Sequence, residues 1–245
     1  INGDISRILT PKFTFFTFKT LDKMQSYIDK VSALLNDEER NENICIDIQK
    51  AYKDKRNILV LTDRIEHINL LRDKLRNIDN LFIISGQSKA NEKKFFYEKL
   101  NNCDNGFVIL STGKYVGEGF DEKKLDTLFI VSPFKWNGTL EQYVGRLHRK
   151  NCNKKDVLVY DYIDINVKTF ENMYHERLRG YKRLGYTIND EDINFEQKIF
   201  NTYAYRNKLL EDVKAAKEEV VLIISDCGND YLNEILDLND RIKIY

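Results

Sequence analysis

The sequence has few of the residues that mark a cross-linked, metal-bound or membrane-embedded protein. Its four cysteines form no CxxC pair, which argues against a disulfide framework and a zinc site. No apolar run approaches the ~20 residues that a membrane span needs. We therefore expect a reducing, cytoplasmic setting, no membrane partner and no metal ligated by this chain. The first residue is Ile1 rather than Met, and no signal-peptide pattern follows it, so we expect a segment of a longer protein.

The sequence also lacks a net charge, because 39 Lys and Arg are balanced by 39 Asp and Glu. Overall charge therefore predicts no polyanionic partner, although a local basic face is compatible with zero net charge. The balance is uneven, since residues 185–245 carry 13 acidic and 7 basic side chains, a net of −6. Together with a helix–strand–helix pattern in that region, the shift predicts a domain boundary near 185–200.

Short apolar runs recur through the middle of the chain. They are continuous rather than alternating, as in strands that are buried on both faces. The runs are ILVLT (58–62), LFIIS (81–85), FVILS (107–111), TLFIV (127–131) and VLVYDYI (157–163). Helix-like segments separate them, at 64–76, 89–100 and 139–149. This alternation predicts an α/β domain with a parallel central sheet over residues 57–185.

The segments on either side of this domain have other patterns. Residues 1–56 contain the extended FTFFTF (13–18) and two helical segments, at 21–35 and 38–53, and we expect them to be a helical lead-in from an upstream domain. Residues 186–245 are expected to form a small C-terminal α/β element. A helix rich in aromatic and basic residues is expected over 167–184, between the sheet domain and that element.

A glycine-rich loop follows the FVILS run. Glycines placed after a parallel strand let backbone amides approach a ligand closely, and ligands of such sheets bind at the carboxyl ends of the strands. Asp121, in the same loop, could accept a hydrogen bond from a ribose hydroxyl. For the loop alone, a plain turn with a solvated carboxylate is the favoured interpretation. The GxxxxGKS/T spacing of a phosphate-binding P-loop is absent.

The next loop leads into a second candidate site. Thr139 and Gln142 fit a capping box, which predicts a helix that begins at Leu140. Gln142, Arg146 and Arg149 then share one helical face. Neither arginine has an acidic residue three or four positions away, and unpaired arginines suit a polyphosphate that accumulates charge in its transition state. On this helix alone, a solvated basic face is the better interpretation.

The two segments together resemble motifs V and VI of superfamily two (DEAD/DEAH-like) helicases, in their C-terminal RecA-like domain. The pattern T-x(4)-G-x-G-x-D falls on Thr112, Gly117, Gly119 and Asp121, and Q-x-x-G-R-x-x-R falls on Gln142, Gly145, Arg146 and Arg149. NILVLTDRIEHINLL resembles motif IV, and LFIISGQS the nucleic-acid-contacting loop after it. The likeness covers about residues 20–185. It looks closest to helicases of the restriction and defence type, which often carry a phospholipase-D-like nuclease module.

The resemblance implies a RecA-like three-layer domain that supplies half of an ATPase site. Arg149 would be the arginine finger on the γ-phosphate, Arg146 a second phosphate contact, and Gln142 would position the attacking water. The residues that would line the nucleotide are Gly117, Gly119 and Asp121. ATP and Mg²⁺ would be held mainly by an upstream RecA-like domain, because this sequence contains neither the P-loop nor the acidic Mg²⁺-binding motif. The chain alone is therefore expected to be inactive.

The resemblance also implies a nucleic-acid partner, with DNA favoured over RNA. Thr62, Gly86 and Thr112 would contact the backbone of the nucleic acid, which reads phosphate and shape rather than bases. Two rivals to the motor remain: a non-catalytic RecA-like scaffold that binds nucleic acid or protein, and a nucleotide-sugar transferase, which the Q-x-x-G-R-x-x-R helix disfavours.

Several segments and residues allow more than one interpretation of their role. Residues 200–245 fit either the start of a phospholipase-D-like module or a small cap. The helix over 172–186 could stack its tyrosines on bases or pack them on the domain. Trp136 could contact the nucleotide, the nucleic acid or its own domain. His67 and His175 are expected to be solvated or packing residues.

Overall fold

The computed structural model describes residues 5–18, 26–103, 105–117, 122–136, 138–148 and 154–189, together with residues 219–220 and 243–244. The chain divides into two compact units, Ile1–Ile193 and Asn194–Tyr245. Within the second unit, β8 (Glu219–Val220) and β9 (Lys243–Ile244) form a parallel pair. The predictions made for the rest of residues 200–245 fall outside the described residues.

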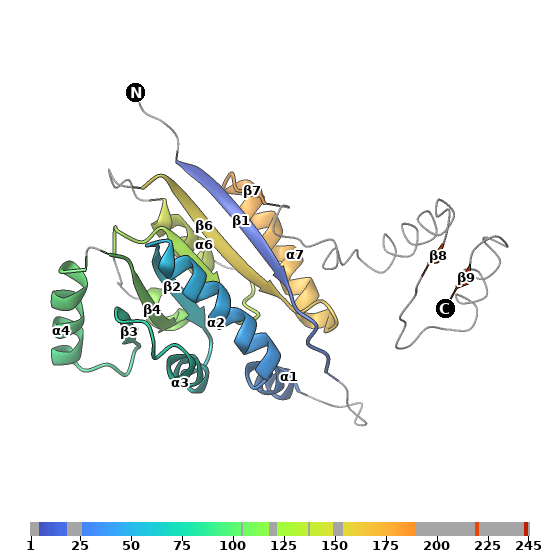
Figure 1. Cartoon of the computed structure of the whole chain (residues 1–245), viewed down its shortest axis with the longest axis horizontal. Coiled ribbons are helices and arrows are strands. Elements are labelled where there is room, and N and C mark those ends of the chain that lie inside the picture. Colours follow the sequence, from blue (N-terminus) through green and yellow to red (C-terminus); the bar gives the residue numbers. More distant parts are fainter. Residues whose placement is uncertain are drawn as a thin grey trace. The chain divides into compact units, whose positions relative to one another are not determined.

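A seven-stranded sheet forms the centre of the first unit, in the order β3-β4-β2-β5-β6-β1-β7 (Figure 1). The strands are β1 (Ser6–Phe13), β2 (Asn57–Thr62), β3 (Leu81–Ile84), β4 (Phe107–Thr112), β5 (Thr127–Ile130), β6 (Asp156–Ile163) and β7 (Thr187–Ile188). Every pairing in this sheet is parallel. The predicted α/β class with a parallel central sheet is therefore confirmed, and the five apolar runs became β2 to β6.

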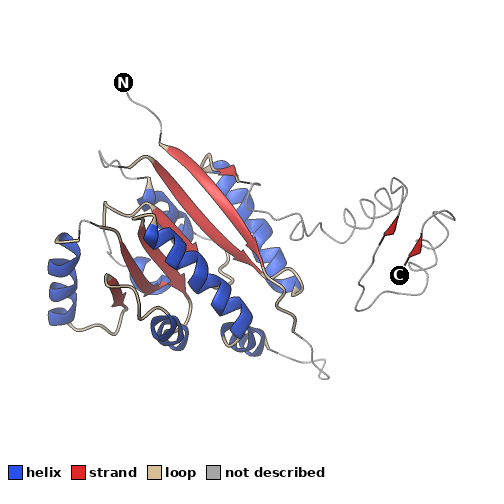
Figure 2. Cartoon of the chain, viewed as in Figure 1, coloured by secondary structure: helices blue, strands red, loops and turns tan. Residues whose placement is uncertain are grey.

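Helices cover both faces of the sheet (Figure 2). They are α1 (Tyr27–Leu35), α2 (Glu38–Lys53), α3 (Ile65–Lys74), α4 (Ala90–Asn101), α5 (Gly113–Gly117), α6 (Gly138–Leu147) and α7 (Lys168–Arg183). Successive side chains of β2 point to opposite faces. Ile58 and Val60 are buried with α2 and α3, whereas Leu59 and Leu61 are buried with residues of α4 to α7. The result is a three-layer α/β/α domain.

Strand β1 comes from residues that the sequence assigned to a helical lead-in. It pairs with β6 along its whole length, from Ser6 to Phe13, and Leu9 is fully buried. The strand gives a weak signal because SRILTPKF has no continuous apolar run, and Pro11 is unusual inside a sheet. Pairing between β1 and β7 ends at Leu9, so the side of Pro11 that lacks an N–H faces no strand partner in β7.

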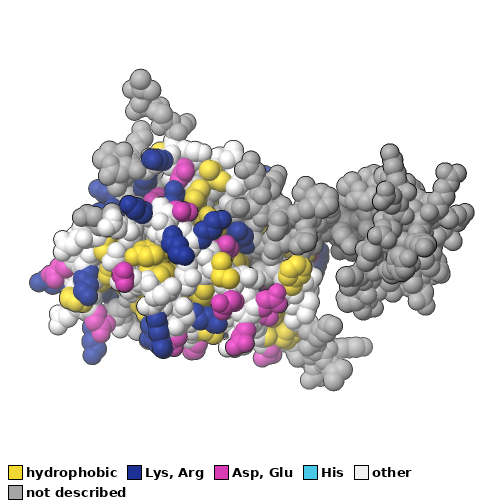
Figure 3. Space-filling model, in the orientation of Figure 1, with side chains coloured by type: hydrophobic (Ala, Val, Ile, Leu, Met, Phe, Trp, Pro, Cys, Tyr) yellow, Lys and Arg dark blue, Asp and Glu magenta, His cyan; other side chains and the backbone are white. Residues whose placement is uncertain are grey.

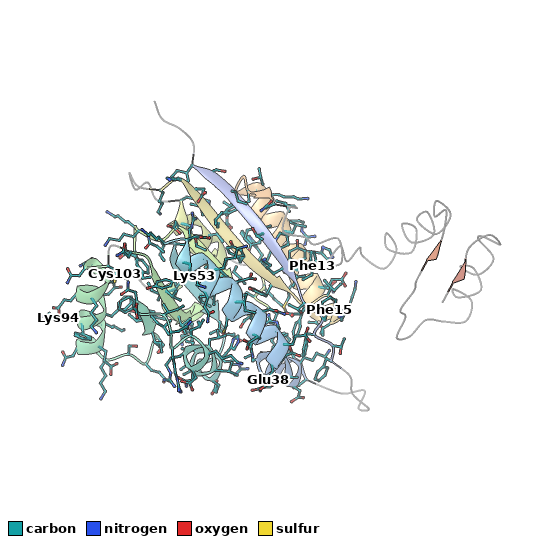
Figure 4. All side chains as sticks on the ribbon, in the orientation of Figure 1. Phe13, Phe15, Glu38, Lys53, Lys94 and Cys103 are labelled. Carbon is teal, nitrogen blue, oxygen red and sulfur yellow. The ribbon has the colours of Figure 1, made fainter. Side chains whose placement is uncertain are left out.

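Helix α2 matches the predicted range of 38–53, and its ends explain the match. The Asp37 side chain accepts a hydrogen bond from the backbone N–H of Arg40 at 2.8 Å, which caps the helix. Acidic residues stand in the first turn and basic residues in the last, the arrangement that the helix dipole favours. Figure 4 labels Glu38 and Lys53 at these two ends. No helix within the described residues is long and apolar enough to cross a membrane.

Candidate functional site

The three residues predicted to contact nucleic acid lie at or just beyond the carboxyl ends of neighbouring strands. Thr62 ends β2 and Thr112 ends β4, and the two residues face each other in the parallel register. Gly86 comes two residues after β3, the strand on the other side of β4. Gly86 is exposed, and no heavy atom would lie within 4 Å of a Cβ added there. The fold thus brings the ends of the three predicted segments to one edge.

Thr62 differs from the other two because its hydroxyl is buried. Its Oγ1 lies 2.8 Å from His67 Nδ1 and 3.0 Å from Ser132 Oγ, and the residue is 1% exposed. The Ser132 hydroxyl in turn accepts a hydrogen bond from the backbone N–H of Asp63 at 3.1 Å. The Thr62 hydroxyl therefore ties the end of β2 to the segment after β5. A contact between this hydroxyl and nucleic acid stays a prediction, and it requires this network to open.

His67 completes the network and is a packing residue rather than a solvated one. Its Nε2 lies 2.9 Å from Asn41 Oδ1, and Asn41 Nδ2 donates to the Leu35 carbonyl at 2.9 Å. Nε2 is therefore the protonated nitrogen, and Nδ1 accepts from Thr62. Burial lowers the pKa of His67 to about 3, and the nearby Arg40 charge acts in the same direction. A neutral imidazole thus links α2, α3 and β2.

This buried imidazole should make the stability of the protein depend on pH. The unfolded chain has a His pKa of about 6.5, so as the pH falls the unfolded state binds the proton first. The contribution of His67 is therefore intact above about pH 6.5 and is lost as the pH falls towards the folded pKa of about 3. The free energy of unfolding, measured by urea titration, should be about 2 kcal/mol lower at about pH 5 than at about pH 7.

Substitutions separate the contribution of His67 to the pH dependence of stability from the contributions of the other histidines. His67→Gln should reduce the pH difference, whereas His175→Gln should preserve it, because the His175 side chain is 47% exposed. Burial also lowers the pKa of His148, to about 4, but that ring is partly exposed and contributes less. A full pH difference in the His67→Gln protein would contradict the assignment.

The predicted arginine helix is present as α6, and it begins at Gly138 rather than at Leu140. Differences of one or two residues at a helix end are common. Gln142 is exposed, and Arg146 lies one turn further along the same helix. The side chain of Arg146 and all of Gly119, Asp121 and Arg149 lie outside the described residues. Their predicted contacts with the nucleotide therefore stay predictions.

The first part of the predicted glycine-rich loop, Gly113–Gly117, is a short helix, α5, rather than a loop, and it contacts the segment that leads into α6. A Cβ added to Gly113, the first residue of α5, would lie 3.2 Å from the Phe134 ring in the β5–α6 connection. Helix α5, which ends at Gly117, also packs against α6. The structure therefore brings together the two segments that carry the predicted nucleotide-lining and phosphate-contacting residues.

The aromatic residues of α7 pack on the domain. Tyr174, Tyr181 and Tyr186, within and just after α7, are buried, so their rings are not exposed for stacking on bases. Trp136 lies against α7, where its ring is 5.2 Å from the Tyr181 ring and a Cβ added to Gly180 would meet it at 2.0 Å. Packing is thus the better interpretation for these residues.

On the face drawn in Figure 3, basic and acidic side chains are intermixed.

Two buried ion pairs at this edge could not be predicted from the sequence. Arg40 pairs with Asp164, and Arg177 pairs with Asp161, each at 2.8 Å. The pairs join residues 124 and 16 positions apart. An arginine on an amphipathic helix is usually solvated, so only the folded structure distinguishes these two.

Comparisons with known proteins decide the family. A family model described as the helicase conserved C-terminal domain matches residues 28–151, which is half of the chain. The chain belongs to the helicase C-terminal domain family. This helicase domain is 24% identical over 183 residues to a putative ATP-dependent RNA helicase of Acanthamoeba polyphaga mimivirus, covering 71% of the chain and 33% of the relative. It is 30% identical over 169 residues to a putative helicase of Invertebrate iridescent virus 6, covering 63% and 36%.

Another relative is a transcript termination protein of Fowlpox virus, 28% identical over 158 residues, with 63% of the chain and 33% of the relative covered. The helicase domain thus spans about a third of the length of these relatives. Among solved structures, T4 UvsW has a TM-score of 0.58 at 18% identity, covering 75% of this chain and 41% of that one. The C-terminal domain of the DEAD-box protein Dbp5 has a TM-score of 0.51 at 11% identity, covering 76% and 89%. These likenesses show the RecA-like fold. A restriction or defence role and a phospholipase-D-like module gain no support from these relatives.

Proposed function

We propose that this helicase domain is the C-terminal half of an ATP-dependent helicase or translocase that moves along nucleic acid. The observation that carries the proposal is the meeting of two segments at the carboxyl edge of the sheet: α5 packs against α6, and the Phe134 ring before α6 lies against Gly113. Ligands of open α/β sheets bind at that edge. Thr112 and Gly86 stand at the same edge, where a nucleic-acid backbone would reach them.

In this proposal, the domain supplies charge and position, and an upstream RecA-like domain supplies most of the ATP and Mg²⁺ site. Arg149 stabilises the charge that develops on the γ-phosphate, Arg146 makes a second phosphate contact, and Gln142 positions the water. Gly117, Gly119 and Asp121 line the nucleotide. Thr62, Gly86 and Thr112 track the nucleic-acid backbone as the two domains close and open.

The nucleic acid in this proposal is DNA, with RNA as the alternative. The residues assigned to nucleic acid would contact its phosphate backbone, and such contacts carry no information about base sequence. The mimivirus relative is named as an RNA helicase, which supports the RNA alternative. A second candidate function, a non-catalytic scaffold, differs from the motor in binding nucleic acid without turning over ATP.

The test is ATP hydrolysis by the intact protein with duplex DNA, single-stranded DNA and single-stranded RNA in turn. We expect turnover to rise with DNA, and we expect the isolated 245-residue chain to show none with any of the three. Stimulation by RNA alone would replace DNA as the substrate. Nucleic-acid binding without ATP turnover by the intact protein would support the scaffold, and stimulated turnover by the isolated chain would contradict the division of the site between two domains.

A further inference from the structure

The segment that joins β5 to α6 is held by two buried arginines through its backbone. Arg40 Nη1 donates to the Val131 carbonyl at 3.0 Å, and Arg177 Nη1 donates to the Phe134 carbonyl at 2.7 Å. Arg40 belongs to α2 and Arg177 to α7, which lie in front of and behind the sheet in Figure 1. The segment that leads into the arginine helix is thus hydrogen-bonded to helices on both faces of the sheet.

Each arginine is fixed by its own carboxylate on or next to β6. Arg177 donates from Nε and Nη2 to the two oxygens of Asp161, both at 2.8 Å. Arg40 donates in the same way to Asp164, at 2.8 and 3.2 Å. All four side chains are at most 1% exposed. Two parallel hydrogen bonds fix the plane of each guanidinium, so the third donor is aimed at the carbonyl.

Buried ion pairs of this kind are weak devices for stability, because desolvation offsets much of the attraction. Their geometry here has a more specific consequence. The Phe134 carbonyl accepts from Arg177, while the Phe134 ring contacts Gly113 at the start of α5. Tyr181, one turn after Arg177, donates its hydroxyl to Asp161 at 3.0 Å. Helix α7 therefore holds Phe134, the residue whose ring contacts the glycine-rich segment and whose chain leads into the arginine helix.

We propose that Arg177 is a positioning residue for α6, and through it for Gln142, Arg146 and Arg149. The proposal rests on the function proposed above for α6. Arg177 is assigned no contact with a reacting group. It donates to the Phe134 carbonyl, and Phe134 lies four residues before Gly138, where α6 begins. Helix α7 lies outside residues 28–151, the segment that the family model matches. Arg177 would thus be a functional residue beyond that segment.

The test uses a variant that removes the hydrogen bond from Arg177 to the Phe134 carbonyl without leaving a buried charge. Arg177→Met alone would strand Asp161, and its loss of folding would be uninformative. The triple variant Arg177→Met, Asp161→Leu, Tyr181→Phe removes the ion pair and the hydroxyl together and replaces them with side chains of similar size, an exchange that buried pairs often tolerate. Lys168→Met is the matched control, because Lys168 pairs with Glu171 on the exposed first turn of the same helix.

Hydrogen exchange on the isolated chain gives the first readout. In the triple variant, the amides of α6 should exchange at least about tenfold faster, while those of α3 exchange as in the unaltered protein. Lys168→Met should leave both helices unchanged. Unaltered exchange in α6 of the triple variant overturns the positioning proposal. This readout requires no ATPase activity, so it stands even if the proposed function fails.

Turnover by the intact protein gives the second readout. Misplacement of catalytic groups by about 1 Å costs about a hundredfold in rate, so kcat for ATP should fall by at least about tenfold in the triple variant. The melting temperature and the affinity for nucleic acid should stay near those of the unaltered protein. Wild-type kcat with faster α6 exchange would also overturn the proposal, since α6 would then be loosened without consequence. Absence of turnover in the unaltered protein would count against the proposed function alone.

Discussion

Replacing Arg149 with alanine in the intact protein should abolish nucleic-acid-stimulated ATP turnover, by about 10³-fold or more, while nucleic-acid binding is largely kept. An arginine finger neutralises the charge that develops on the transferring phosphoryl group. Loss of such a finger typically lowers kcat by about 10³- to 10⁵-fold, and we expect a loss in this range for the variant. The nucleic-acid contacts assigned to Gly86 and Thr112 come from the ends of β3 and β4, so binding of nucleic acid should not depend on this guanidinium.

Steady-state turnover at saturating nucleic acid, together with a binding titration, measures the two effects separately. Arg179→Ala is the matched control, because Arg179 is an exposed arginine on α7 and the proposed ATP site does not include it. Its turnover should equal that of the unaltered protein. If Arg149→Ala hydrolyses ATP at the unaltered rate, Arg149 is not the finger, and the assignment of the Q-x-x-G-R-x-x-R pattern to phosphate contacts fails with it.

Much of the central sheet could be predicted because its strands are buried on both faces and need continuous apolar runs. The run ILVLT is an example: Ile58 to Leu61 are each at most 2% exposed, and the run became β2. The same reasoning missed β1. That strand lies next to the two-residue β7 near the sheet edge, and three of its eight residues are buried, so its pattern is irregular.

The candidate site segments could be proposed from the sequence because the spacing of their glycines and arginines matches helicase motifs V and VI. What could not be found is the part of the site that depends on pairs distant in sequence. Asp164 and Arg40 are ordinary polar residues in the sequence, and their partnership appears only when β6 and α2 pack together. The engagement of the Thr62 hydroxyl by Ser132, 70 positions later, was hidden in the same way. Spacing predicts motifs, but it does not predict which buried polar groups satisfy each other.

The Arg40–Asp164 pair should be among the most sensitive points of the folded domain. Arg40→Met leaves the Asp164 carboxylate buried, with the Thr14 hydroxyl as a remaining donor at 2.5 Å. Removing one partner of a buried pair costs about 3–5 kcal/mol, because the other charge loses its compensation. Urea unfolding at neutral pH should show this loss in the isolated chain. Arg72→Met is the control: its pair with Asp73 is half-exposed, so water screens the two charges and the free energy of unfolding should change far less than in Arg40→Met.

A second substitution identifies the origin of that cost. If the uncompensated carboxylate is responsible, Arg40→Met combined with Asp164→Leu should recover most of the lost free energy of unfolding, because an apolar pair needs no compensation. If the double variant is as unstable as Arg40→Met alone, the cost comes from elsewhere, such as the Val131 carbonyl that Arg40 also satisfies. That outcome would make the hydrogen bond to the β5–α6 segment, rather than the charge pair itself, the main contribution of Arg40 to the fold.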